Sequence, residues 1–222
     1  MSISDVDPTL DAGLGAELRV DATPGVAPLA IDDAAADVLF RAAHTANTFS
    51  DEPVADDQVR AIYELIKWAP TSMNTQPLRV TLVRTSEARE RLLRHMAPGN
   101  QAKTAAAPLV AVLTADRLFH DTLPHLLAHK PGAREIFLDD DVRDAVAGFN
   151  GALQVGYFIL GVRAAGLAAG PMTGYDTAGL EAEFFPAGDR RVLAVVNIGR
   201  PGPGAFRPRL PRLPYEQVVT TV

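Results

Sequence analysis

The sequence predicts a single α+β domain. Segments with helical spacing of apolar residues alternate with strand-like runs. One of these runs alternates at 78–84, and two continuous apolar runs lie at 108–114 and 191–198. The chain has 222 residues, which allow one substantial core but are few for two independent enzymatic domains. We therefore expect residues 31–222 to form one domain.

Two helices are predicted near the start of this domain. Residues 33–46 and 56–69 carry apolar side chains at helical spacing. The second helix begins with Asp56 and Asp57, whose carboxylates favour the positive end of a helix. It ends near Pro70, because proline has no N–H to donate to the preceding turn.

A strand, a helix and a second strand are expected next. Residues 78–84 alternate as a strand does, and Ser86 is expected to cap a third helix. Pro98-Gly99 breaks that helix. The apolar run 108–114 is typical of a strand covered on both faces, and residues 115–138 show no clear pattern.

The long segment 142–166 predicts one central helix. Four glycines interrupt it, at 148, 151, 156 and 161. Each glycine costs a helix about 1 kcal/mol relative to alanine, so we expect close backbone approach to another element. A membrane span is the alternative interpretation, but Gln154 and Arg163 interrupt the apolar stretch and the preceding residues are acidic. We expect a core helix that also contacts a second copy of the protein.

The two ends of the chain differ from its middle. Residues 1–30 are rich in Asp, Ala, Gly and Pro and predict a flexible arm. After the buried strand 191–198, the Pro- and Arg-rich residues 199–214 predict an extended tail. Residues 215–222 are then expected to add an extended segment to a sheet edge across a dimer.

Composition excludes several classes of function. The net charge is −6, and no stripe of Lys or Arg is present, so a nucleic-acid partner is not expected. The absence of cysteine excludes disulfides, thiol nucleophiles and thiolate metal sites. The N-terminus lacks a basic patch followed by an apolar core, so we expect a cytoplasmic protein that binds no membrane.

Common catalytic motifs are also missing. His120, His125 and His129 are close in sequence, but Pro124 interrupts any helix carrying the first two and no carboxylate is suitably spaced, so no metal site is expected. No Gly-x-Ser-x-Gly elbow supports a serine nucleophile. No Gly-x-Gly-x-x-Gly follows a strand, so a nicotinamide nucleotide would bind only transiently.

The polar loop before strand 78–84 is the strongest candidate binding segment. It lies between a helix and a strand, and its side chains offer hydroxyls and amides but no ionisable group: Thr71, Ser72, Asn74 and Gln76. This set suits the carbonyl and ring-nitrogen edge of a heterocycle better than it suits a scissile bond. A well-capped turn is the alternative interpretation.

Several blocks of the chain resemble the FMN-dependent nitroreductase family. They are Leu-Phe-Arg-Ala-Ala-His44-Thr-Ala-Asn47-Thr-Phe49, Ala69-Pro70-Thr71-Ser72-x-Asn74-x-Gln76-Pro77 and Gly170-Pro171-Met172-Thr173-Gly174-Tyr175-Asp176. They occur in the same order as in that family, over roughly residues 30–222. Their sequences are similar to those of the malonic semialdehyde reductase subfamily.

The resemblance implies a fold, a cofactor and an activity. The fold is a mixed, mainly antiparallel sheet flanked by helices in an intertwined homodimer, with FMN at each interface. The activity is ping-pong hydride transfer from NADH or NADPH through the flavin to a small acceptor, so no protein residue is catalytic. The implied cofactor-binding residues are His44, Thr45, Asn47, Pro70, Thr71, Ser72, Asn74, Gln76, Pro171, Met172, Thr173, Gly174, Arg209 and Arg212.

One departure from the family pattern affects the phosphate. The wider family has arginines where this chain has His44 and Asn47, which give hydrogen bonds without a permanent charge. We expect Arg209 and Arg212 to supply the missing charge. The glycines at 170 and 174 allow backbone to lie against a flat ring, although an ordinary helix-to-strand turn fits them equally well.

Three functions remain open at this point. The subfamily resemblance implies reduction of malonic semialdehyde to 3-hydroxypropionate. A broad nitroaromatic or quinone reductase would share the cofactor residues and differ only at 115–138. A non-catalytic flavin-binding dimer is the third alternative, because His44 and Asn47 would bind the FMN phosphate more weakly than the arginines of the wider family.

Overall fold

The computed structural model describes residues 29–222; the flexible arm predicted at 1–30 lies outside them, apart from its last two residues. Four strands form one sheet in the order β1-β2-β4-β3. Their bounds are Leu78–Val83 (β1), Leu109–Asp116 (β2), Ala168–Met172 (β3) and Arg190–Gly199 (β4). All three strand pairs are antiparallel. The α+β class and the mainly antiparallel sheet are therefore confirmed, with no parallel pair among the described strands.

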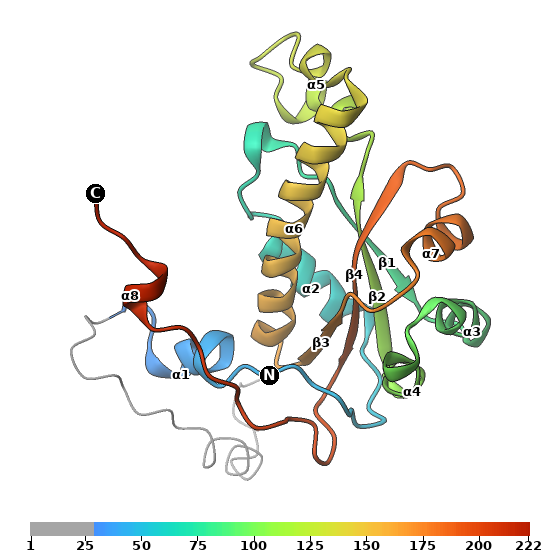
Figure 1. Cartoon of the computed structure of the whole chain (residues 1–222), viewed down its shortest axis with the longest axis vertical. Helices are drawn as coiled ribbons and strands as arrows, with labels where there is room; N and C mark the ends of the chain where they lie inside the picture. The colour runs from blue at the N-terminus through green and yellow to red at the C-terminus, as the bar shows by residue number, and fades with distance from the viewer. Residues whose placement is uncertain (1–28) are drawn as a thin grey trace, which may run out of the picture.

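Helices cover both faces of the sheet (Figure 1). On one face lie α2 (Asp56–Ile66) and α6 (Asp140–Ala164), and on the other α3 (Ser86–His95), α4 (Pro98–Ala106) and α7 (Thr177–Phe184). Strand β2 is buried along its whole length, as its apolar run predicts. Ala111 and Leu113 pack toward α2 and α6, and Val110 and Val112 toward the other layer. This alternation follows from the two-residue period of a strand.

The remaining elements are short. They are α1 (Asp33–Ala36), the π-helical turn η1 (Asp37–Arg41), η2 (Ser72–Asn74), η3 (Phe119–Thr122), α5 (Leu123–Leu126), η4 (Arg134–Phe137) and α8 (Tyr215–Val218). Residues 117–139 form a small lobe of η3, α5 and η4 above the start of α6 (Figure 1). This lobe contains most of the segment 115–138, which shows no clear pattern in the sequence. Phe119 and Phe137 pack edge to face inside this lobe, with ring centroids 5.1 Å apart.

Helix α6 is the central helix that the sequence predicts. By length and composition it is long and apolar enough to cross a membrane, the one such helix among residues 29–222. Its buried residues, however, face the sheet and α2, as expected of a core helix. A Cβ at Gly151 would lie 2.7 Å from Leu193, and one at Gly161 would collide with Ile66. The expected close approach is therefore found at these two glycines, whereas a Cβ at Gly156 would meet open space.

The first predicted helix is too long. The structure ends it at Arg41, whereas the sequence predicted residues 33–46. The reason is tertiary: the backbone N–H of Ala46 donates to the oxygen of Ala169 at 3.0 Å, and that of Asn47 donates to the oxygen of Ala205 at 2.9 Å. Donors committed to β3 and to the tail cannot also continue a helix.

Four further elements differ from the sequence prediction. Thr85, and not Ser86, caps α3, because its hydroxyl accepts from the N–H of Ala88 at 3.1 Å. Pro98 begins helix α4, since the first helical position needs no N–H donor. Strand β3 and helix α7 were not predicted, because the glycine and proline of β3 read as a turn.

The C-terminal tail is extended over 200–214, as predicted. Beyond β4, residues 200–214 contain no helix or paired strand, except for the bridge between Pro201 and Phe49. Figure 1 shows this tail passing beside α1 and projecting away from the sheet. Residues 215–218 form the helical turn α8, where an extended segment was expected, and none of residues 215–222 pairs with a strand of the described chain.

Replacing Gly161 tests the contact between α2 and α6. In Gly161→Ala the added methyl overlaps Ile66 and lies 3.2 Å from Ile62. Overpacking of this kind costs about 1–3 kcal/mol, and the better helix propensity of alanine returns about 1 kcal/mol. We expect urea titration to show a net loss in the free energy of unfolding. Gly99→Ala, in α4 with open space, should lose nothing, and equal effects would contradict the packing argument.

Candidate functional site

The loop that precedes β1 has a strained backbone. Met73, Asn74 and Gln76 have positive φ angles of 50°, 54° and 41°, the only such values among non-glycine residues from 29 to 222. Non-glycine residues rarely adopt this region and keep it only where their surroundings enforce it. Three strained residues within a stretch of four point to a binding site.

Two amide side chains of α6 hold this loop in place. Asn150 Oδ1 accepts a hydrogen bond from the backbone N–H of Ser72 at 2.7 Å, and Gln154 Oε1 accepts from that of Leu78 at 2.9 Å. Both amides are buried, and they lie one turn apart on the same face of the helix. In the sequence, Gln154 is noticeable only as an interruption of an apolar stretch. The sequence feature that could have revealed its role is a pair of amides, at positions i and i+4, on the buried face of the helix.

The side chains of the loop are partly engaged with one another. Thr71 Oγ1 accepts from the N–H of Gln76 at 3.2 Å, and Gln76 Nε2 donates to Asn74 Oδ1 at 2.7 Å. Asn74 Nδ2 donates to the oxygen of Leu126 at 2.9 Å, which ties the loop to α5. The loop borders an open depression of about 400 Å³, lined by Tyr63, Lys67, Trp68, Ala69, Pro70, Thr71, Asn74 and Gln76.

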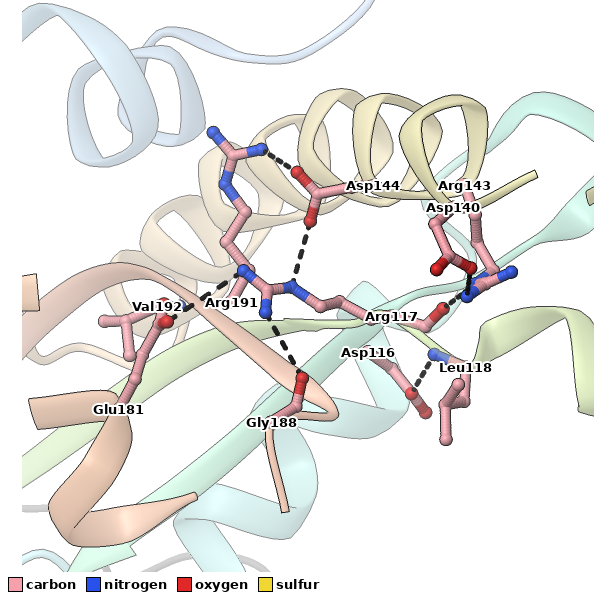
Figure 2. Close-up of polar contacts among 10 residues, drawn as sticks. All are labelled: Asp116, Arg117, Leu118, Asp140, Arg143, Asp144, Glu181, Gly188, Arg191 and Val192. Carbon is pink, nitrogen blue, oxygen red and sulfur yellow. Dashed lines mark hydrogen bonds and ion pairs between the residues drawn. The ribbon is translucent and has the colours of Figure 1, made fainter. Parts of the chain in front are cut away.

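An ion-pair network fixes the part of α6 that carries these amides (Figure 2). Asp144 accepts from Arg117 at 3.0 Å and from Arg191 at 2.8 Å, so one helical carboxylate joins the ends of β2 and β4. Arg143 donates to the oxygen of Arg117 at 2.8 Å. Glu181 of α7 accepts from the N–H of Val192 at 2.8 Å. The network holds α6 in register with the sheet.

The segment from 170 to 174 is built differently from its prediction. Pro171 and Met172 belong to β3, and the buried side chain of Met172 faces Thr104 of α4. The bend therefore begins only at Thr173, which is exposed. Gly174 follows, and its oxygen accepts from the N–H of Ala97 at 3.0 Å.

Positive charge gathers at the opposite end of α6. Arg209 Nη2 donates to the backbone oxygens of Arg41 at 2.5 Å and Ala43 at 3.1 Å, which brings the tail beside His44. His44 also lies against Phe206, with ring centroids 5.5 Å apart. Burial, together with the charges of Arg209, Arg163 and Arg212, lowers the pKa of His44, so its neutral form is favoured.

Two other predicted residues of this end, Asn47 and Arg212, donate only to backbone oxygens. Asn47 Nδ2 donates to the oxygens of Thr45 at 3.3 Å and Ala205 at 3.5 Å. Arg212 donates only to the backbone oxygens of Leu210 and Pro211. Arg163, at the end of α6, was not predicted as a site residue. The sequence feature that could have identified it is a cation within an otherwise apolar helical segment.

One chain does not bring all the predicted residues together. The loop leads into β1 and the bend follows β3, and these are the two edge strands of the sheet, about 14 Å apart at the usual strand spacing. Asn150 beside the loop and Arg163 beside the basic residues are 13 positions apart in α6, or about 20 Å along its axis. The predicted residues therefore form two half-sites in one chain.

The histidines of the 117–139 lobe form no metal site. His120 is buried, and its Nε2 lies 3.7 Å from Asp121, whereas His125 and His129 are not buried. Within residues 29–222, no group of three or more His, Cys, Asp or Glu side chains is arranged to hold a metal ion.

Comparison with known proteins identifies the family. The model of the nitroreductase family matches residues 41–200, well over half of the chain. A protein of Streptomyces coelicolor, named as a candidate NADH dehydrogenase/NAD(P)H nitroreductase, is 62% identical over 195 residues, which are 87% of this chain and 99% of that protein.

Solved structures show the same fold at low identity. A candidate nitroreductase from Exiguobacterium sibiricum, solved in complex with FMN, has a TM-score of 0.75 and 17% identity, covering 89% of this chain and 100% of its own. A candidate NAD(P)H:FMN oxidoreductase from Staphylococcus epidermidis has a TM-score of 0.75 and 15% identity, with the same coverage. The nitroreductase-like fold is confirmed, and the chain belongs to the nitroreductase family and hence to the oxidoreductases.

Proposed function

We propose that this protein is an FMN-dependent NAD(P)H oxidoreductase that works as a homodimer, with a flavin site at each interface. The observation that carries the proposal is the pair of half-sites at opposite ends of α6. One half offers amides and hydroxyls on a strained loop, and the other offers guanidinium groups. A ring system with a phosphate-bearing chain needs both kinds of group.

The loop half fits the ring of the flavin. When bound, FMN supplies hydride transfer between NADH or NADPH and an acceptor, which is chemistry that the side chains of this chain lack. Thr71, Ser72, Asn74 and Gln76 would bind the ring and its ribityl chain, with Pro70 setting the start of the loop. The hydrogen bonds within the loop order its polar groups in advance, so less binding energy would be spent on ordering them.

The basic half fits the phosphate. His44, Thr45 and Asn47 would contribute hydrogen bonds, and Arg209 and Arg212 would contribute charge. The structure supports this assignment, because Arg209 docks on the backbone beside His44. Because the side chain of Met172 is buried, only its backbone atoms would face the ring, together with Pro171, Thr173 and Gly174.

A dimer reconciles the separation of the two half-sites. The face of α6 next to the one that carries Asn150 and Gln154 has apolar side chains at helical spacing: Phe149, Leu153, Tyr157 and Leu160. Phe149 is 71% exposed and Tyr157 is 40% exposed in the single chain. Two such helices packed in antiparallel fashion would place the loop of one chain near the basic half of the other. The projecting tail could then contact the second chain of the dimer.

We propose two alternative classes of acceptor. The subfamily resemblance supports malonic semialdehyde, reduced to 3-hydroxypropionate. The name of the Streptomyces coelicolor relative favours a broader nitroaromatic or quinone reductase instead. Lys67 is the only cation lining the depression beside the loop, and it is engaged by Glu64 and by the ring of Trp68. We also propose a cytoplasmic location, in keeping with the use of NADH or NADPH.

The cofactor is the first test. The purified protein should be yellow, and acid should release FMN from it. Either NADH or NADPH should bleach the flavin absorbance in an anaerobic stopped-flow experiment. A colourless protein that binds no added FMN would refute the proposal, and bound flavin that neither nucleotide bleaches would support the non-catalytic dimer.

The same reduced protein then distinguishes the acceptors. Return of the flavin absorbance on mixing with malonic semialdehyde supports the narrow proposal. Return with nitrofurazone or a quinone, but not with the semialdehyde, supports the broad reductase.

Asn150→Ala tests the support of the loop. The variant leaves the part-buried N–H of Ser72 without its side-chain partner and releases the strained residues. We expect FMN affinity, measured by fluorescence quenching, to fall about tenfold, the loss expected from one unmade hydrogen bond. Gln58→Ala is the control, because it removes a similar bond from the N–H of Ala55, away from the loop. Equal losses in the two variants would contradict the assigned role.

Phe149→Glu tests the dimer. A charge placed in an apolar interface must be desolvated, so the dimer should dissociate in size-exclusion chromatography with light scattering. FMN affinity should fall with it, because each site needs both chains. Ala105→Glu adds the same charge to exposed α4 and should change neither property. A monomeric variant with full FMN affinity would show that one chain completes the site.

A further inference from the structure

Arg163 lies in the last turn of α6, next to the basic residues of the tail. Its side chain is half-buried, and its guanidinium donates one hydrogen bond, to the backbone oxygen of Leu39 at 3.3 Å. Burial and the neighbouring charge of Arg209 lower the pKa of Arg163. A cation at a helix C-terminus stabilises the helix dipole. The dipole does not explain why this cation is partly buried beside another arginine.

The charges around Arg163 are not balanced within the described chain. Among residues 29–222, Arg163, Arg209 and Arg212 form no ion pair with a carboxylate within 4.0 Å. The two acidic side chains within α1 and η1, Asp33 and Asp37, are both engaged by Arg41. The region therefore holds an excess of positive charge, which an anion would relieve.

The chemistry of the region selects a phosphate group. Guanidinium groups bind phosphate through paired N–H donors, and such charge-assisted hydrogen bonds are stronger than neutral ones. Arg163 comes from α6, Arg209 from the tail and His44 from the segment after η1, so three different elements converge on one region. Residues from several distant segments are expected to converge at a site that binds a small group such as phosphate from several sides.

We propose that Arg163 is a ligand of the flavin phosphate in this chain, acting with Arg209 to supply the charge that His44 and Asn47 lack. This inference rests on the proposed function and adds to it a residue that determines specificity. Arg163 makes binding depend on the phosphate, and so distinguishes FMN from riboflavin, which has the same ring and ribityl chain without it.

The test compares the two flavins. Dissociation constants for FMN and riboflavin are measured by fluorescence quenching for the wild-type protein, Arg163→Ala, Arg163→Lys and the control Arg60→Ala. Arg60 is an exposed arginine of α2 without an ion pair in the described chain. We expect Arg163→Ala to raise the FMN dissociation constant about tenfold to a hundredfold, as loss of a charge-assisted hydrogen bond does. Riboflavin affinity should not change, and lysine should restore part of the FMN affinity.

Each other outcome has a distinct meaning. Equal weakening of FMN and riboflavin would show that Arg163 only holds α6 against η1, and an unchanged FMN constant would show that it does not touch the phosphate. Either result overturns the inference while leaving the proposed function intact. If the wild-type protein binds neither flavin, the proposed function itself is wrong. Calorimetric titration with inorganic pyrophosphate then decides whether Arg163 binds an anion at all, since Arg163→Ala should weaken that binding.

Discussion

The site depends on one interaction, the docking of α6 on the sheet through both apolar and polar groups. Apolar residues and two glycines bring the helix close to β2, β4 and α2. That closeness places Asn150 and Gln154 within hydrogen-bonding distance of backbone donors at Ser72 and Leu78. Both hydrogen bonds are part-buried, and each contributes about 1 kcal/mol net, so the amides fix where the loop lies. The same helix carries Arg163 at its other end, so its position sets both half-sites.

The strained loop and the unbalanced arginines are complementary departures from ordinary protein structure. Three left-handed non-glycine residues are unfavourable unless the surroundings enforce them, and clustered guanidinium groups without carboxylates are unfavourable unless an anion joins them. The protein maintains both at opposite ends of a helix whose exposed face is apolar. A shared flavin accounts for all three observations, since it would use the polar loop, supply the anion and bridge two chains.

Local patterns predicted most of the framework and part of the site. Strands β1, β2 and β4 and helices α2, α3 and α6 were predicted within a few residues, because each shows its own period of apolar residues. Strand β3 was missed, because its glycine and proline read as a turn, and it forms only through pairing with β4. For the same kind of reason, the first predicted helix ran past Arg41. Donors at 46 and 47 are captured by β3 and the tail.

The sequence by itself determined the fold class, the family and the chemical character of the binding segments, because these depend on residue types and short-range spacing. Only the tertiary structure decided which groups meet. It showed that the loop and the bend lie at opposite edges of the sheet, that Met172 turns into the core, and that Arg163 joins the basic residues of the tail. Such pairings join residues far apart in the chain. They follow from the packing of α6 and the sheet together, a property that no local pattern contains.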